Sequence, residues 1–254
     1  MIRFHTLCTR KNLLSALTML LLFIISLNAD AGIVASATRI IFLQGERENT
    51  LMLANTNKYP VVVQSWIDDG DVDNTPDQAK APFLPLPAVF KMQPGSMQSL
   101  RIISKGNQPA SDRESVYWLN LYEIPPKERS NNEDNPQVAM AMNTQMKVFY
   151  RPKGLTHSPE AAMKKVNFTL IQNAGETRLR SHNPTPYHVS FGQMTLSLKG
   201  KKINILQEMD MMTPPFSERE YSTENPLPAN AHGATLTYSY FDDSGAQISQ
   251  TQSL

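Results

Sequence analysis

Cysteine is nearly absent from this sequence: the only one among 254 residues is Cys8, close to the start of the chain. The rest of the chain therefore has neither a disulfide nor a thiol nucleophile. Because no covalent cross-link can replace burial, the fold needs an apolar core. The composition supports one, since 41% of the residues are hydrophobic and 19% are charged.

Motifs of catalysis and metal binding are also missing. The sequence has no G-x-S-x-G elbow, P-loop, G-x-G-x-x-G segment or H-E-x-x-H pair. The acidic segment Asp68–Asn74 fails the calcium-loop template, because Asn74 replaces the required glycine and Lys80 the required glutamate. We expect no cofactor, no metal and no enzyme activity, although a Ser-His-Asp triad assembled by folding stays open at this point.

One long apolar run, Leu13–Leu27, lies near the N-terminus. Basic residues precede it, and Ala29–Ala31 then has the small-x-small pattern of a cleavage site. We expect residues 1–31 to be a secretory signal peptide and the mature chain to begin at Gly32. The alternative is an uncleaved membrane anchor, for which the run is short. Cys8 lies too early in the chain to be a lipoprotein attachment site.

The charge of the expected mature chain is close to zero. Removing three of the 24 basic residues and one of the 23 acidic residues leaves 21 and 22. A nucleic-acid partner requires a basic excess, so we expect none.

The remaining sequence has the pattern of successive strands. It is richer in proline than in glycine, with 18 against 11 in the whole chain, and no helical periodicity extends over ten residues. Short apolar segments separated by frequent turn residues are typical of a β-sandwich. We expect strands over Thr38–Leu43, Thr50–Ala54, Val61–Ile67, Met97–Ile103, Val116–Ile124, Val138–Pro152, Val166–Gln172, Tyr187–Phe191, Met194–Leu198 and Thr235–Phe241.

A linker is expected over Arg151–Pro159, which contains two prolines and a glycine. It divides the chain into an N-terminal domain, residues 32–152, and a C-terminal domain, residues 153–254. Each has the size of an immunoglobulin-like domain. The sequence shows no strong internal repeat between them.

The segment Val138–Pro152 is the most informative of the expected strands. A long strand with exposed apolar side chains invites pairing with another chain. We therefore interpret it as a strand whose partner lies on another molecule. The polar segment Lys127–Gln137 leads into it. Its apolar residues alternate, with a gap at Thr144, at Val138, Met140, Met142, Met146, Val148 and Tyr150.

Two basic residues lie inside apolar strands: Arg39 in T-R-I-I-F and Lys147 in M-K-V-F-Y-R-P. Taken singly, each suits a solvent-facing edge strand, where charge discourages aggregation. If the two converge in a cleft, they would instead bind a carboxylate. The two residues alone leave both interpretations open.

Six motifs, in order along the chain, carry a family resemblance. They are T-R-I-I-F (38–42), S-W-I (65–67), Q-P-G (93–95), D-R-E-S-V-Y-W-L-N-L-Y-E-I-P-P (112–126), M-K-V-F-Y-R-P (146–152) and N-P-T-P-Y (183–187). With them the sequence resembles the periplasmic chaperones of the chaperone–usher pilus pathway. The resemblance implies an all-β fold of two immunoglobulin-like β-sandwich domains at an angle, with an interdomain cleft. It also implies a periplasmic protein without a cofactor or membrane anchor, whose partners are pilus (fimbrial) subunits and an outer-membrane usher.

Chaperones of this family lend a strand to a subunit whose own sandwich is incomplete. Strict alternation puts Lys147 on the opposite face from the donor residues. Either a bulge near Thr144 brings them together, or the two groups serve different faces. The resemblance assigns the anchor for the subunit's C-terminal carboxylate to Arg39 and Lys147, the donor residues to Val138, Met140 and Met142, and an interdomain salt-bridge network to Glu114, Arg151 and Asp243.

The sequence departs from the family pattern in the donor strand, where methionine takes two of three positions usually held by Leu, Ile or Val. Methionine adapts to irregular pockets, which suggests tolerance for several subunits.

The moderately short segment Lys127–Gln137 favours the short-loop branch of the family. Leu86-Pro87 aligns with a position where the family can have a cis proline. A self-capping homodimer stays possible, and the alternative functions are a secreted adhesion module and a periplasmic hydrolase.

Overall fold

The structure is a computed structural model that describes residues 32–71, 74–106, 109–126, 140–173, 176–225 and 233–254. The expected signal peptide, the segment Lys127–Gln137 and the expected donor residue Val138 lie outside these ranges. Within the described part of the chain, no helix is long and apolar enough to cross a membrane.

The N-terminal half folds into two sheets, with strand orders β1-β3-β7-β5 and β2-β9-β8-β4-β6. Neighbouring strands are antiparallel except β2 and β9, which run parallel. The strands are β1 (Ile33–Ala35), β2 (Arg39–Leu43), β3 (Glu48–Asn55), β4 (Val61–Asp68), β5 (Phe83–Leu86), β6 (Val89–Met92), β7 (Met97–Ser104), β8 (Ser115–Ile124) and β9 (Met142–Arg151).

The core of this sandwich comes from the alternation of side chains along its strands. Phe42, Leu53, Leu100 and Val148 are fully buried between the two sheets. The chain passes from one sheet to the other between β1 and β2, because β1 pairs with β3 while β2 pairs with β9. The Leu86-Pro87 peptide bond after β5 is cis.

The C-terminal half forms a second sandwich from a sheet of order β10-β11-β15 and a sheet of order β13-β12-β16-β17, in which β14 also pairs with β12. A short helix precedes it, capped by the Ser158 hydroxyl, which accepts from the Ala161 N–H. The elements are α2 (Pro159–Met163), β10 (Asn167–Asn173), β11 (Glu176–Asn183), β12 (Val189–Leu198), β13 (Lys201–Asn204), β14 (Met212–Thr213), β15 (Ser217–Ser222), β16 (Thr235–Phe241) and β17 (Gln247–Ser253).

One strand prediction was wrong: the strands expected over 187–191 and 194–198 are a single strand, β12. Its pairing with β16 shifts register between Phe191 and Met194. Gly192 lies at this irregularity, and a Cβ atom there would come within 2.6 Å of the Ser239 hydroxyl. The bulge interrupts the apolar alternation, which is why the sequence looked like two strands.

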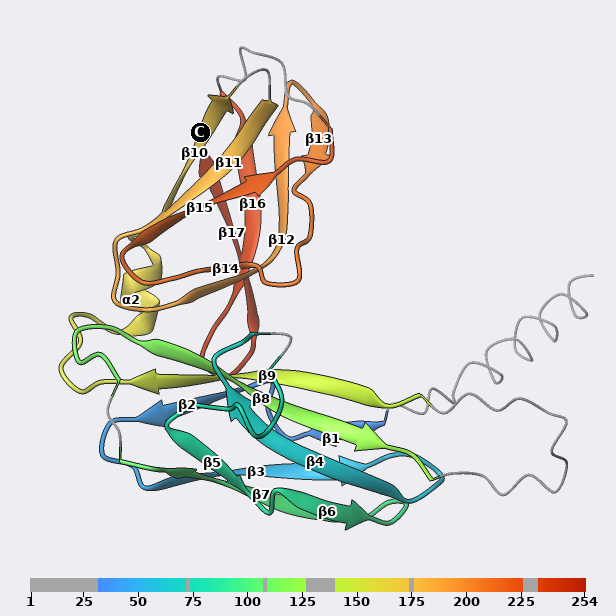
Figure 1. The fold of residues 1–254 in the computed structure, drawn as a ribbon. Coiled ribbons are helices and arrows are strands. Elements are labelled where there is room, and N and C mark those ends of the chain that lie inside the picture. Colours follow the sequence, from blue (N-terminus) through green and yellow to red (C-terminus); the bar gives the residue numbers. More distant parts are fainter. Residues whose placement is uncertain (1–31, 72–73, 107–108, 127–139, 174–175, 226–232) are drawn as a thin grey trace, which may run out of the picture.

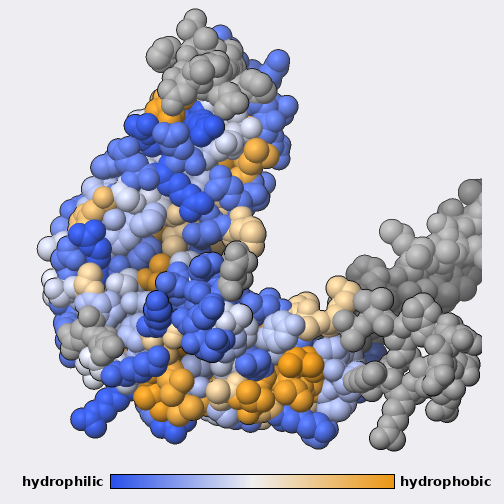
Figure 2. Space-filling view, in the orientation of Figure 1, coloured by the Kyte–Doolittle hydropathy of each residue, from blue (hydrophilic) through white to orange (hydrophobic). Residues whose placement is uncertain are grey.

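The two sandwiches meet at a steep angle, and β8 and β9 lie beneath the base of the C-terminal domain (Figure 1). The space-filling view shows a hollow between the two domains and apolar surface gathered on the N-terminal domain (Figure 2). The predicted all-β class with two sandwich domains is confirmed. The division at residues 152 and 153 stays a prediction.

The two sandwiches share a turn motif that was not predicted from the sequence. Asn55 donates to the carbonyl of Tyr59 at 3.1 Å and accepts from the backbone N–H two residues on at 3.0 Å. Asn183 does the same, with a 2.7 Å bond to the carbonyl of Tyr187 and a 3.1 Å bond from the N–H two residues on. Each buried asparagine thus fixes the turn that follows its strand.

The acidic segment is tied into the N-terminal sandwich by Asp68, which is 1% exposed. Its carboxylate accepts from Trp66 Nε1 at 2.9 Å, from the Gly70 N–H at 2.9 Å and from Asn120 Nδ2 at 2.7 Å. These bonds give the carboxylate a structural role at the end of β4.

Candidate functional site

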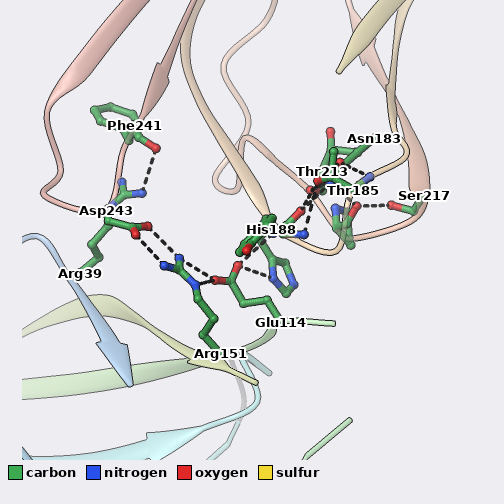
Figure 3. Close-up of polar contacts among 12 residues, drawn as sticks. Arg39, Glu114, Arg151, Asn183, Thr185, His188, Thr213, Ser217, Phe241 and Asp243 are labelled. Atoms are coloured by element: carbon green, nitrogen blue, oxygen red, sulfur yellow. Dashed lines mark hydrogen bonds and ion pairs between the residues drawn. The ribbon is translucent and has the colours of Figure 1, made fainter. Parts of the chain in front are cut away.

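Three charged residues from both domains meet at the domain junction (Figure 3). Glu114 lies just before β8, Arg151 ends β9, and Asp243 follows β16. Arg151 donates to Glu114 Oε1 from Nε at 3.0 Å and from Nη2 at 2.9 Å. It also makes a two-point pair with Asp243, at 2.6 and 2.7 Å. The guanidinium therefore joins the N-terminal domain to the C-terminal one.

Glu114 is almost fully enclosed, with 3% of its surface exposed. Its other oxygen, Oε2, accepts from the backbone N–H of His188 at 2.9 Å and lies 3.2 Å from the Nδ1 atom of the same residue. The backbone N–H of Glu114 donates to the Pro186 carbonyl at 2.8 Å. One buried carboxylate thus contacts both domains through several bonds.

Burial of Arg151 disfavours its charge, but the hydrogen bond to Asp243 and the charge of Glu114 outweigh that penalty. The pKa of Arg151 is therefore raised above its ordinary value. The guanidinium also lies over the ring of Tyr187, 5.2 Å from the ring centroid.

Arg39, at the start of β2, also reaches the C-terminal domain. Its Nη1 donates to the Phe241 carbonyl at 3.4 Å, and its guanidinium lies 5.2 Å from the centroid of the Phe241 ring. The Nε atom is buried and has no hydrogen-bond partner among the described residues. Burial lowers the pKa of Arg39, while the nearby charges of Asp243, Asp242 and Glu114 oppose this.

Lys147 lies opposite Arg39 in the parallel pairing of β2 with β9. Paired residues on neighbouring strands face the same side of a sheet, so both basic side chains face the C-terminal domain. Lys147 Nζ forms a 2.7 Å ion pair with Asp210 of that domain. The structure therefore brings the two predicted anchor residues together in the register of one sheet.

The first half of β9 is a free edge among the described residues. Residues 142–146 pair with β8 on one side, whereas pairing with β2 on the other side begins only at Lys147. Met142 is 53% exposed, and Met140, just before the strand, is 80% exposed. Met146 is buried at 5% and belongs to the core. The edge therefore combines unpaired backbone with exposed apolar side chains.

The β8–β9 register runs without interruption from Met142 to Tyr150, so there is no bulge near Thr144. Of the two alternatives, the structure has the one with separate faces: Met142 is on the face of Met146 and Val148, and Lys147 is on the other. The expected donor residue Val138 lies outside the described residues.

A pocket between the domains adjoins this ion-pair network. Residues of β2, β9, α2 and β16 contribute to its walls. The lining residues are Arg39, Glu114, Phe149, Arg151, Pro159, Glu160, Met163, Tyr187, His188, Tyr240, Phe241, Asp242, Asp243 and Ile248.

Sequence reasoning missed the partners that the second domain supplies. His188 and Phe241 carry no motif that points to the junction. Asp210 stands in the sequence Q-E-M-D-M-M, which has no charge pattern suggesting a contact with Lys147, 63 residues earlier. Only the arrangement of the two domains reveals these contacts.

Two family models match the chain and together span nearly all of the described residues. The PapD N-terminal domain of pili and flagellar-assembly chaperones matches residues 32–156, and the C-terminal domain of the pili assembly chaperone PapD matches residues 161–252. The chain belongs to this family of two-domain pilus assembly chaperones.

Individual relatives agree with this assignment. The chain is 34% identical to the chaperone protein MrkB of Klebsiella pneumoniae over 229 residues, which cover 89% of this chain and 93% of MrkB. It is 33% identical to the probable fimbrial chaperone YadV of Escherichia coli over 225 residues, 88% and 90% of the two chains.

Solved structures show the same fold. The YadV chaperone matches with a TM-score of 0.74 at 30% identity, covering 88% of this chain and all 100% of YadV. The CupB2 chaperone of Pseudomonas aeruginosa matches with a TM-score of 0.69 at 31% identity, covering 87% and 100%. The family is one of chaperones rather than enzymes.

Proposed function

We propose that this pilus assembly chaperone acts in the periplasm, where it binds a fimbrial subunit by adding β9 to the subunit's incomplete sandwich and then delivers it to an outer-membrane usher. The observation that carries the proposal is the free edge of β9 at residues 142–146, which ends where Arg39 and Lys147 face each other. No cofactor enters the exchange of one strand for another.

The topology suggests how an added strand would lie. The free edge of β9 is on the same side as β2, because β2 occupies that side from Lys147 onward. A subunit strand running parallel to β9 would continue the line of β2 and would stop short of Arg39, where β2 begins. Its C-terminal carboxylate would then arrive next to the two basic side chains. A free carboxylate at a strand end is the group that such a pair binds well.

The backbone, the methionines and the charged anchor would each contribute to subunit binding in a different way. Backbone hydrogen bonds along β9 would provide binding that is independent of the subunit's sequence. Met140 and Met142 would bury apolar surface in the subunit's groove. The charged anchor would set the register, because a shift of one residue turns every side chain to the wrong face.

The buried Nε atom of Arg39, which has no hydrogen-bond partner in the described part of the chain, supports the anchor role. A buried unpaired donor is costly, and a carboxylate acceptor would remove that cost. The ion-pair network of Glu114, Arg151 and Asp243 would hold the two domains at the angle that the site needs. In the free protein, the exposed edge would be covered in a self-capping homodimer.

The flexible methionines of the donor segment support tolerance for several subunits. We also propose that the chain belongs to the short-loop branch of the family, which the moderate length of the segment Lys127–Gln137 supports. Affinity purification from a periplasm that holds all subunits of one fimbrial gene cluster should recover more than one of them. Recovery of a single subunit would contradict the tolerance.

The anchor is tested by co-expressing a fimbrial subunit with the wild type, Arg39→Ala or Lys147→Ala. Both variants should remain folded while the periplasmic level of the subunit falls, because an uncapped subunit aggregates or is degraded. Lys91→Ala, which removes an exposed lysine of β6, is the control and should leave the subunit level unchanged. Normal subunit levels with both anchor variants would contradict the proposal.

A further inference from the structure

A carboxylate of the chaperone itself already occupies one half of the proposed anchor. Asp210 lies in the segment between β13 and β14 of the C-terminal domain. Its Oδ1 atom is 2.7 Å from Lys147 Nζ, and the side chains of Lys147 and Asp210 are 23% and 36% exposed. This ion pair crosses from one domain to the other at the end of the free edge of β9.

Asp210 is held in this position by a second cation. Its Oδ2 atom lies 3.4 Å from Arg219 Nη1, which also donates to the Met212 carbonyl at 2.8 Å. The Nη2 atom of Arg219 is fixed by Glu208 at 2.7 Å. Burial disfavours the charge of Arg219, but the bond to Glu208 outweighs it, and the pKa of Arg219 is raised. Asp210 is therefore oriented by its own domain before it contacts Lys147.

The two halves of the anchor differ in a way that bears on binding. The guanidinium of Arg39 has a buried Nε without a hydrogen-bond partner among the described residues, whereas Lys147 is neutralised by a carboxylate of the same chain. An incoming carboxylate at Lys147 would lie close to Asp210, and two carboxylates beside one ammonium group repel each other.

We propose that Asp210 is an affinity-determining residue that occupies Lys147 in the free chaperone and releases it when the C-terminal carboxylate of a subunit binds. This inference rests on the proposed function and adds an internal competitor to it. The competitor penalises ligands that offer only a carboxylate. A subunit strand that also pairs with β9 compensates for the loss of the Lys147–Asp210 pair.

The test measures the affinity of the full chaperone for a synthetic peptide of alternating apolar residues with a free C-terminal carboxylate, and for the same peptide as a C-terminal amide. Asp210→Asn keeps the shape of the side chain and removes its charge. The variant should bind the carboxylate peptide about two- to fivefold more tightly, as expected for a partly exposed ion pair. The amide peptide should bind with unchanged affinity, so the preference for carboxylate over amide increases.

Glu224→Gln is the matched control, because it removes one exposed carboxylate charge from the same domain, and that carboxylate accepts from Asn204 rather than from Lys147 or Arg219. It should leave the carboxylate preference unchanged. In a Lys147→Ala background, Asp210→Asn should have no further effect, since the two residues act through one contact. Asp210→Asn and the control variant should each retain the wild-type melting temperature to within a few degrees.

The outcomes separate the two proposals. If Lys147→Ala weakens binding of the carboxylate peptide but Asp210→Asn leaves it unchanged or weakens it, Asp210 is no competitor and the proposed function stands. If Lys147→Ala and Arg39→Ala both bind the carboxylate and amide peptides as the wild type does, the anchor itself is wrong. Equal tightening by Asp210→Asn and Glu224→Gln would show a general charge effect and would overturn the inference.

Discussion

Truncating Glu114 is the sharpest test of how the two domains are held together. Its carboxylate accepts two bonds from Arg151 and one from the backbone N–H of His188, and its side chain is 2% exposed. Glu114→Ala leaves the guanidinium of Arg151 with a single carboxylate, that of Asp243, whose side chain is 42% exposed. It also leaves the His188 N–H without its acceptor.

The expected loss of stability follows from these contacts. Removing one partner of a buried ion pair costs about 3–5 kcal/mol. Because Asp243 still neutralises Arg151, we expect the lower value, about 3 kcal/mol. For two domains that unfold as a unit of this size, that loss lowers the melting temperature by about 6–12 °C. Glu114→Gln should lose less, since its amide oxygen can still accept hydrogen bonds.

Differential scanning calorimetry and small-angle X-ray scattering check the prediction together. Glu114→Ala should lower the melting temperature and increase the radius of gyration, because the domain junction loosens. Glu48→Ala is the control: it removes an exposed carboxylate that pairs with Arg101 across β3 and β7, and should cost less than about 1 kcal/mol. A melting temperature and scattering profile of Glu114→Ala equal to those of the wild type would refute the role of Glu114 at the junction.

Three further predictions concern single side chains. Burial raises the pKa of Tyr221 to about 12, and its hydroxyl lies 3.0 Å from that of Thr213. The unfolded chain loses this proton near its ordinary pKa of about 10, so the stabilisation is present below pH 10 and is lost as the pH rises to 12. At pH 11 the contribution of Tyr221 has fallen by about 1.3 kcal/mol relative to pH 9, so in urea unfolding Tyr221→Phe should lose about that much less than the wild type over the same pH range. Asp68→Ala should cost roughly 3 kcal/mol in the same measurement, because Asn120 and two other donors lose a buried acceptor. Met142→Lys should weaken subunit binding about tenfold or more in a calorimetric titration without lowering the melting temperature, because this side chain is 53% exposed in the free chaperone.

Each of these has a matched control. Tyr59→Phe removes a hydroxyl from an exposed ring and should keep the pH dependence of the wild type. The same pH dependence in Tyr221→Phe and the wild type would contradict the first prediction. Asp69→Ala alters the exposed neighbour of Asp68, and equal losses in the two variants would count against a structural role for Asp68. Met97→Lys changes a 67% exposed methionine in the other sheet and should bind like the wild type.

The sequence predicted the longer strands that are rich in apolar residues, whereas the short strands β1, β5 and β6 were missed although they are mostly apolar. β8 was predicted because its sequence V-Y-W-L-N-L-Y-E-I is rich in aromatic and β-branched or other large apolar residues. β11 and β15 were missed, since each contributes one large apolar side chain, Leu179 or Tyr221, to the core. Their charged residues form cross-strand ion pairs, such as Arg180 with Glu220 at 2.9 Å. Such complementarity becomes visible only once the register is known.

The site likewise has residues that the sequence predicted and contacts that it could not predict. Arg39 and Lys147 stood out in the sequence because a charge inside an apolar strand is unusual. The contact of Lys147 with Asp210 could not be predicted, because it joins two domains whose relative placement depends on many weak packing terms. The sequence also could not decide whether a bulge lies near Thr144, since bulges change register without a reliable residue signal.

The position of Lys147 relative to the free edge of β9 has a consequence for the length of a partner. Lys147 and Met140 are seven residues apart, which in an extended chain is about 23 Å. A subunit whose terminal strand is shorter than this could reach the proposed anchor with its carboxylate but would leave Met140 exposed to water. The chaperone would then discriminate among subunits by the length of the terminal strand, counted from the carboxylate. The number of residues in the subunit's terminal strand would therefore matter more for binding than the composition of that strand.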